Sequence, residues 1–72
     1  NNYEKAEKFL KRAVELMPDD PIVNDYYGDI LWKLDRKIQA RYFWKNVLQM
    51  KDAEEEMIKK INDKLVNGLN NL

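Results

Sequence analysis

The chain has 72 residues with thirteen Lys and Arg, thirteen Asp and Glu and a formal net charge of zero, and it contains no His, Cys, Ser or Thr. Zinc fingers, Cys–His nucleophile pairs, hydroxyl triads and the Ser/Thr ligand of a phosphate-binding loop are therefore excluded, and neither an enzymatic activity nor a cofactor is expected. A chain of this length forms one small domain, and its 44% hydrophobic content indicates a folded polypeptide.

The first half of the chain predicts two helices. Apolar residues recur at three- and four-residue spacing over residues 3–17, which predicts a helix that ends before Pro18. Asp20 is a favourable N-cap and Pro21 suits the first helical position, so a second helix is expected to start there and to end near Asp35.

The second half predicts two further helices. One covers residues 36–50, and the other starts at Asp52, which forms a capping-box pattern with Glu55. The fourth helix is expected to end at Gly68, in the left-handed C-cap position, with a frayed tail after it. No stretch alternates with period two, so the fold class is all-α, and the short connections predict antiparallel neighbouring helices.

The sequence also matches itself after a shift of 34 residues, which indicates that one helical hairpin is used more than once. Small residues fall on small residues and large on large, so that a small side chain lets two helices approach closely and a large one fills the space beyond. The matched pairs are Ala6 with Ala40, Phe9 with Phe43, Leu10 with Trp44 and Ala13 with Val47.

This period and pattern resemble the tetratricopeptide repeat family. The positions that match its signature are Tyr27, Gly28, Leu31, Ala40, Trp44 and Val47, preceded by Ala6, Leu10, Ala13 and Pro18 from half of another repeat. Three residues depart from the family pattern. Asn24 stands where a bulky residue is common, Asp35 replaces a turn glycine, and Asp52 replaces the closing proline.

The resemblance implies a short α-solenoid of four helices arranged as antiparallel hairpins. Residues 1–18 would be the second helix of a preceding repeat, residues 19–52 one complete repeat, and residues 53–72 a C-terminal capping helix with its tail. Because each repeat buries its apolar face against neighbours, the chain is expected to be the C-terminal end of a longer array.

The first helix of such a fragment has an uncovered face, expected around Tyr3, Phe9 and Val14. Self-association into a homo-oligomer through this face is one hypothesis. The chain starts with neither an initiator Met nor a signal peptide, so its native compartment is not visible and the cytoplasm is the default.

In the tetratricopeptide family the first helix of each repeat lines a concave groove. The matching positions here are Ile22, Asp25, Asp29, Trp32 and Lys33. The resemblance implies a scaffold for protein–protein interaction that binds a neutral or basic protein segment in an acidic groove. Family members that grip a C-terminal carboxylate carry Lys and Asn where this chain has Asp25 and Asp29, so no carboxylate clamp is expected.

Plainer interpretations of the same residues remain open. Asp25 and Asp29 could simply solvate a helix and complement its dipole, and Trp32 could be covered by a neighbouring helix. A catalytic pair of carboxylates would need a cleft that one helix face does not supply. The fragment as a whole could be a structural end cap of a longer array, or a self-associating fragment, with no ligand site of its own.

The charged residues are segregated along the chain. Residues 19–35 carry five acids and one Lys, whereas residues 36–51 carry five bases and no acid. The bases of the third helix form a narrow stripe, but with a net charge of zero a solvated convex face is favoured, and neither a nucleic-acid nor a membrane partner is expected. The acidic run that starts at Asp52 lacks the glycine and alternating ligands of a calcium loop and is attributed to helix capping.

Overall fold

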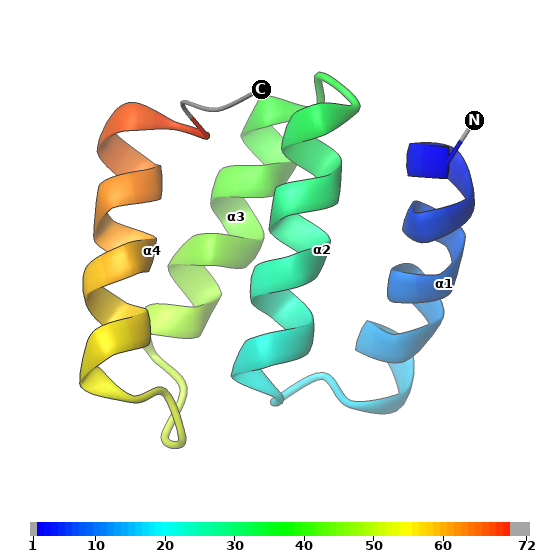
Figure 1. The fold of residues 1–72 in the computed structure, drawn as a ribbon. Coiled ribbons are helices and arrows are strands. Elements are labelled where there is room, and N and C mark those ends of the chain that lie inside the picture. The colour runs from blue at the N-terminus through cyan, green and yellow to red at the C-terminus, as the bar shows by residue number, and fades with distance from the viewer. Residues whose placement is uncertain (1, 70–72) are drawn as a thin grey trace.

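The computed structural model describes residues 2–69, which form four α-helices and no strand. The helices are α1 (Asn2–Leu16), α2 (Pro21–Lys33), α3 (Lys37–Leu48) and α4 (Glu55–Asn67). The all-α fold class is therefore confirmed. Each helix runs antiparallel to the one before it, with the α2–α3 turn at one end of the molecule and the other two loops at the opposite end (Figure 1).

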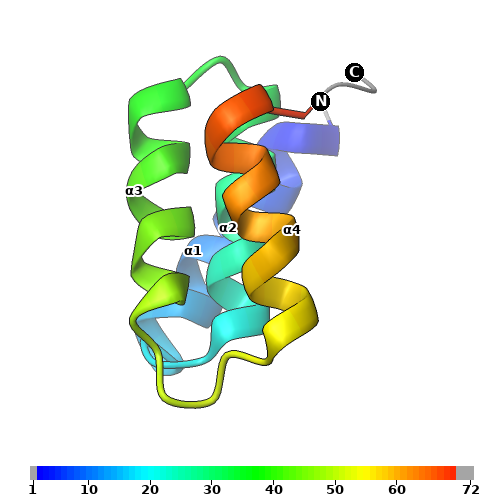
Figure 2. The ribbon, with the colours of Figure 1, turned by 90° about the vertical axis from the view of Figure 1, so that its left-hand side faces the viewer.

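The helices pack in chain order, because α1 contacts α2, α2 contacts α3, and α3 contacts α4. Seen from the side of α4, α3 lies on one side of the molecule and α2 and α4 lie on the other (Figure 2). The tail expected to fray after residue 69 lies outside the described residues.

Most predicted helix ends are within one or two residues of the observed ones, and the start of α2 is confirmed in detail. The Val23 amide donates to Asp20 Oδ1 at 3.1 Å, and Pro21 occupies the first turn. Asn24, one of the three departures from the tetratricopeptide pattern, is 2% exposed and donates through Nδ2 to the carbonyl oxygens of Pro18 and Asp20. A bulky apolar residue could not hold the α1–α2 loop in this way.

The predicted start of α4 is wrong. The helix begins at Glu55, its N-cap is Glu54, and no side chain makes a capping hydrogen bond there. The reason is the preceding turn, in which the Ala53 amide donates to the Met50 carbonyl at 3.2 Å. Asp52 lies inside this turn and is therefore too early in the chain to cap the helix.

The core is centred on Trp44, whose side chain is fully buried between α2, α3 and α4. Gly28 of α2 faces it, and a Cβ at this position would collide with the indole and lie 3.2 Å from the Ala40 carbonyl oxygen. Next to this contact, the rings of Tyr27 and Phe43 meet edge to face with centroids 4.7 Å apart. The α2–α3 hairpin is thus held by a glycine against an indole and by an aromatic pair.

Within residues 2–69, two positions have positive backbone φ angles. Asp35 has φ 63° in the turn between α2 and α3, where the Arg36 amide closes the turn on the Leu31 carbonyl at 2.8 Å. Gly68 ends α4 with φ 68° and ψ −161°. The positive φ predicted for Gly68 is confirmed, although its ψ places it in the extended region open only to glycine rather than in the left-handed helical region.

Helix α1 has no buried residue. Leu10 and Val14 are half-buried against the core, whereas Phe9 is 74% exposed and Leu16 is 65% exposed. The expectation that Val14 lies on the open face is therefore wrong, because Val14 belongs to the side of α1 that packs toward α2. Tyr3 is 44% exposed and lies beside the ammonium of Lys33, which is 5.4 Å from its ring centroid.

Candidate functional site

The five groove positions expected on α2 lie in different environments. Ile22 is 52% exposed, and Lys33 is also exposed. Asp25 is buried at 8% exposure, and Asp29 and Trp32 are half-buried. The five residues therefore do not form one continuous open surface, and each needs its own description.

Asp25 and Asp29 are joined to α4 by one lysine, Lys64. Its Nζ lies 2.7 Å from Asp25 Oδ1 and 2.9 Å from Asp29 Oδ1. The three side chains are 17%, 12% and 27% exposed for Lys64, Asp25 and Asp29, so the ion pairs are largely shielded from water. Asp29 Oδ1 also accepts a hydrogen bond from Trp44 Nε1 at 3.1 Å. The acids fasten α2 to α3 and α4, and solvation of a free helix face is not their role.

The pKa values of Asp29 and Lys64 reflect burial opposed by pairing. Burial raises the pKa of Asp29 above its ordinary value, although the hydrogen bonds from Lys64 and Trp44 oppose the rise. Burial alone would lower the pKa of Lys64, but its hydrogen bonds to Asp25 and Asp29 and their charges outweigh this effect and raise that pKa. Lys64 therefore remains an ammonium ion at neutral pH and is a permanent counter-ion for the two acids.

Lys64 was not predicted as part of the site, yet the sequence contains a signal for it. Met57, Ile61 and Leu65 form the apolar stripe of α4, and Lys64 lies within the same stripe. A lysine on a buried helix face needs an acidic partner, because an unpaired buried charge is costly. The acids on α2 were the available partners.

Trp32 is enclosed by aromatic, cationic and backbone groups. Its ring stacks on Trp44 with centroids 5.5 Å apart, and the cationic groups of Lys37 and Arg41 lie 5.0 and 5.4 Å from its ring centroid. A Cβ on Gly68 would collide with the same indole. Trp32 therefore links the C-terminal ends of α2 and α4 to the start of α3, and it is not free to act as an anchor for a ligand.

Ile22 lines a pocket of about 310 Å³ beside the N-terminal ends of α2 and α4. The pocket combines apolar side chains with carboxylates, and its lining residues are Asp19, Asp20, Pro21, Ile22, Asp52, Glu54 and Met57. Asp20 is already used as the N-cap of α2. Within residues 2–69, no ion pair joins Asp19, Asp52 or Glu54 to a basic group. This pocket therefore places Ile22 beside carboxylates that have no basic partner among the described residues.

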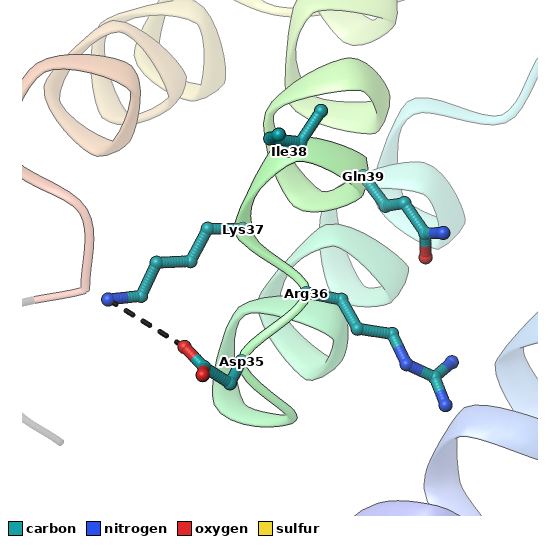
Figure 3. Close-up of a pocket in the computed structure, with 5 residues that line it drawn as sticks. All are labelled: Asp35, Arg36, Lys37, Ile38 and Gln39. Carbon is teal, nitrogen blue, oxygen red and sulfur yellow. Dashed lines mark ion pairs between the residues drawn. The ribbon is translucent and has the colours of Figure 1, made fainter.

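A second concavity of about 370 Å³ surrounds the turn between α2 and α3. Figure 3 shows that its side chains point in different directions: Lys37 lies toward Asp35, with an Nζ–Oδ1 distance of 3.9 Å, while Arg36 and Gln39 point away from that pair. The polar groups do not converge on a common point, so this concavity does not define a site.

The predicted basic stripe of α3 is partly used inside the molecule, because Lys37 and Arg41 lie over the Trp32 ring. Among the described residues, no group of three or more acidic side chains is placed to hold a metal ion. None of the four helices is long and apolar enough, over residues 2–69, to cross a bilayer.

No protein-family model, curated protein or solved structure matches this chain. The resemblance to the tetratricopeptide repeat therefore depends on the chain's own 34-residue period and on its residues.

Proposed function

We propose that the chain is a non-enzymatic protein–protein interaction module of the tetratricopeptide type, which binds a neutral or basic protein segment on its acidic groove side. The observation that carries the proposal is the pocket beside the N-terminal ends of α2 and α4. Its volume of about 310 Å³ lies at the lower end of the range for ligand pockets. Ile22, one of the groove positions, lines it.

The chemistry of this pocket suits a lysine or arginine side chain. Such a side chain has an aliphatic stem, which would lie on Ile22 and Met57, and a charged head, which would reach Asp52 or Glu54. Asp25 and Asp29, the acids of the groove hypothesis, are both paired with Lys64 and take no part in this proposal. The acidic contribution to binding comes from the two loops instead.

The proposal can be tested by NMR titration with capped, extended peptides that differ only in a central Lys, Glu or norleucine. We expect the Lys peptide to shift the amide resonances around Ile22 and the Glu peptide to leave them unchanged. Asp52→Lys combined with Glu54→Lys should abolish the shifts. The matched control, Glu55→Lys with Glu56→Lys, changes the net charge equally on exposed residues that do not line the pocket, and it should preserve them. Equal responses to the Lys and Glu peptides would contradict the proposal.

A second candidate function is that of a structural end cap. The observation that favours it is the docking of α4, which buries Ile61 completely and pairs Lys64 with two acids on α2. In this case Ile61→Asp would release α4, expose the Trp44 side of α3 and cause self-association, measured by light scattering. The pocket variants described above would remain monomeric. The unsubstituted chain would already fail to bind any of the peptides.

A further inference from the structure

Two large apolar side chains are exposed together on the outer face of α3. Within residues 2–69, Ile38 is the most exposed large hydrophobic residue, at 86%, and Tyr42, one helical turn later, is 61% exposed. Lys45 continues the same face by a further turn and is also exposed. We call these three residues the α3 outer face. Neighbouring apolar side chains that remain in water indicate an interaction surface.

The two helices that pack against α3 leave this face open. Helix α3 contacts α2 and α4, and its inner face supplies Ala40, Trp44 and Val47, which are fully buried in the core. In Figure 2, α3 forms one side of the molecule, while α2 and α4 lie on the other. Ile38 and Tyr42 point away from the core that these three helices share, and their exposure follows from the packing of α3 itself.

The Tyr42 ring is held by contacts that lead into the core. It meets the ring of Phe43 edge to face, with centroids 5.2 Å apart, and Phe43 in turn meets Tyr27 of α2 with centroids 4.7 Å apart. Because this series of rings restrains Tyr42, the side chain loses little conformational freedom when a partner packs on it. A restrained, exposed aromatic ring is a favourable anchor for binding.

The charge on α3 distinguishes between candidate partners. Residues 36–51 carry five bases and no acid. Lys45 forms no ion pair within residues 2–69, and the guanidinium of Arg41 lies on the flank of the helix, over the Trp32 ring. A partner that supplies carboxylates complements these charges, whereas a second copy of the chain that paired through the same face would bring like charges together.

A bilayer and a nucleic acid fit this face less well than an acidic protein segment. A helix that binds a bilayer presents a broad apolar face, but every other apolar residue of α3 is buried or half-buried inside the fold. A nucleic-acid-binding domain is distinctly basic, and the net charge of this chain is zero. An acidic segment needs only an apolar contact and a basic group beside it, and the α3 outer face has both.

We propose that the α3 outer face binds an acidic segment of a partner protein that carries an apolar side chain. The apolar side chain lies across Ile38 and Tyr42, and a carboxylate reaches Lys45. At about 1.5 Å per residue, Lys45 is about 7.5 Å along the helix axis from the midpoint of Ile38 and Tyr42. Residues two apart in an extended segment share a face and are about 6.6 Å apart. The recognised pattern is therefore an apolar residue with an acidic residue two positions away.

The probes are capped seven-residue peptides, titrated into the intact chain at low ionic strength and followed by NMR. The parent peptide has a central leucine, a glutamate two positions to either side, and alanine elsewhere. One variant replaces the leucine by serine, and another replaces both glutamates by glutamine. We expect the parent peptide to shift the amide resonances of residues 38–45, and each variant to bind ~5-fold more weakly or worse, because it lacks the apolar or the charged contact.

Matched substitutions in the chain test the face itself. Ile38→Ser and Lys45→Glu should each weaken binding of the parent peptide by ~5-fold or more. Val66→Ser and Lys60→Glu are the controls, because they make the same changes at exposed residues of α4, and they should leave the affinity unchanged. All four residues are exposed, so circular dichroism should show the same helix content in every variant.

The proposal is overturned if the serine peptide binds as tightly as the parent peptide, or if Ile38→Ser binds the parent peptide like the unsubstituted chain. It is also overturned if phosphatidylserine vesicles bind through Ile38 while the parent peptide causes no shifts, or if the chain self-associates through Ile38 and takes up no peptide. The α3 outer face shares no residue with the pocket at Ile22. Asp52→Lys with Glu54→Lys should therefore not weaken binding of the parent peptide, so the two proposals succeed or fail separately.

Discussion

Replacing Lys64 should destabilise the fold by removing one identifiable interaction, its ion pairs with Asp25 and Asp29. In Lys64→Met the long apolar side chain is kept and the ammonium is removed. Asp25 and Asp29 then lose their only cationic hydrogen-bond donor among the described residues, while Trp44 Nε1 still donates to Asp29. The substitution thus leaves two acids on one face of α2 without a counter-ion.

The expected cost follows from the burial of these groups. Breaking a fully buried ion pair by removing one partner costs about 3–5 kcal/mol. Here the side chains of Asp25 and Asp29 are still 12% and 27% exposed, so water can partly solvate the unpaired carboxylates and the cost is smaller. We therefore expect Lys64→Met to lower the free energy of unfolding by about 2–4 kcal/mol. A domain of this size has a total stability of only about 4–10 kcal/mol, so the transition should shift strongly.

Urea denaturation followed by circular dichroism and tryptophan fluorescence measures this effect, because Lys64 Nζ lies 5.8 Å from the Trp44 ring centroid. Lys60→Met, on the exposed face of α4, is the control and should change stability by less than about 0.5 kcal/mol. Adding Asp25→Asn and Asp29→Asn to Lys64→Met should restore much of the stability, since the unpaired charges are then absent. If Lys64→Met and Lys60→Met cost the same, the ion-pair argument is wrong.

Three further outcomes are expected. Gly28→Ala should cost about 1–3 kcal/mol in thermal or urea unfolding, because its Cβ collides with the Trp44 indole. Asp35→Gly should raise stability by about 0.5–1 kcal/mol in the same assays, because it relieves a positive φ of 63° while the unfolded chain becomes more flexible. Burial and the hydrogen bond to Glu7 raise the pKa of Tyr27 from 10.0 to about 12, so its neutral form contributes fully below pH 10 and this contribution is lost as the pH rises to 12. Urea titrations across this range should show a loss of roughly 2–3 kcal/mol that Tyr27→Phe removes, and an unchanged pH profile in the variant would contradict the assignment.

The helices could be predicted because their signals are local. Apolar spacing and the Asp20-Pro21 start depend on residues within one or two turns, and these predictions agree with the observed bounds of α1, α2 and α3. The start of α4 was missed because Asp52 and Glu55 have capping-box spacing, whereas hydrogen bonds of the preceding turn decide where the helix begins. A spacing rule cannot choose between a turn and a cap when both fit the same residues.

The environment of the groove residues could not be predicted from α2 alone. Asp25 and Asp29 satisfy every condition for an exposed acidic face, but Lys64, their partner, lies 39 and 35 residues further along the chain. Trp32 is likewise covered by groups from α3 and by Gly68. A resemblance to a repeat family indicates which helix face lines a groove, and the residues of the next helix determine how much of that face remains open.

The zero net charge of the chain is the sum of alternating segments. Residues 1–18 carry four bases and three acids, residues 19–35 have a net charge of −4, residues 36–51 have +5, and residues 52–72 carry three bases and five acids. Segments that follow one another in the chain therefore differ in the sign of their net charge, whereas the Lys64 ion pairs join two segments that are both net acidic, so these specific contacts depend on individual residues and not on segment charge.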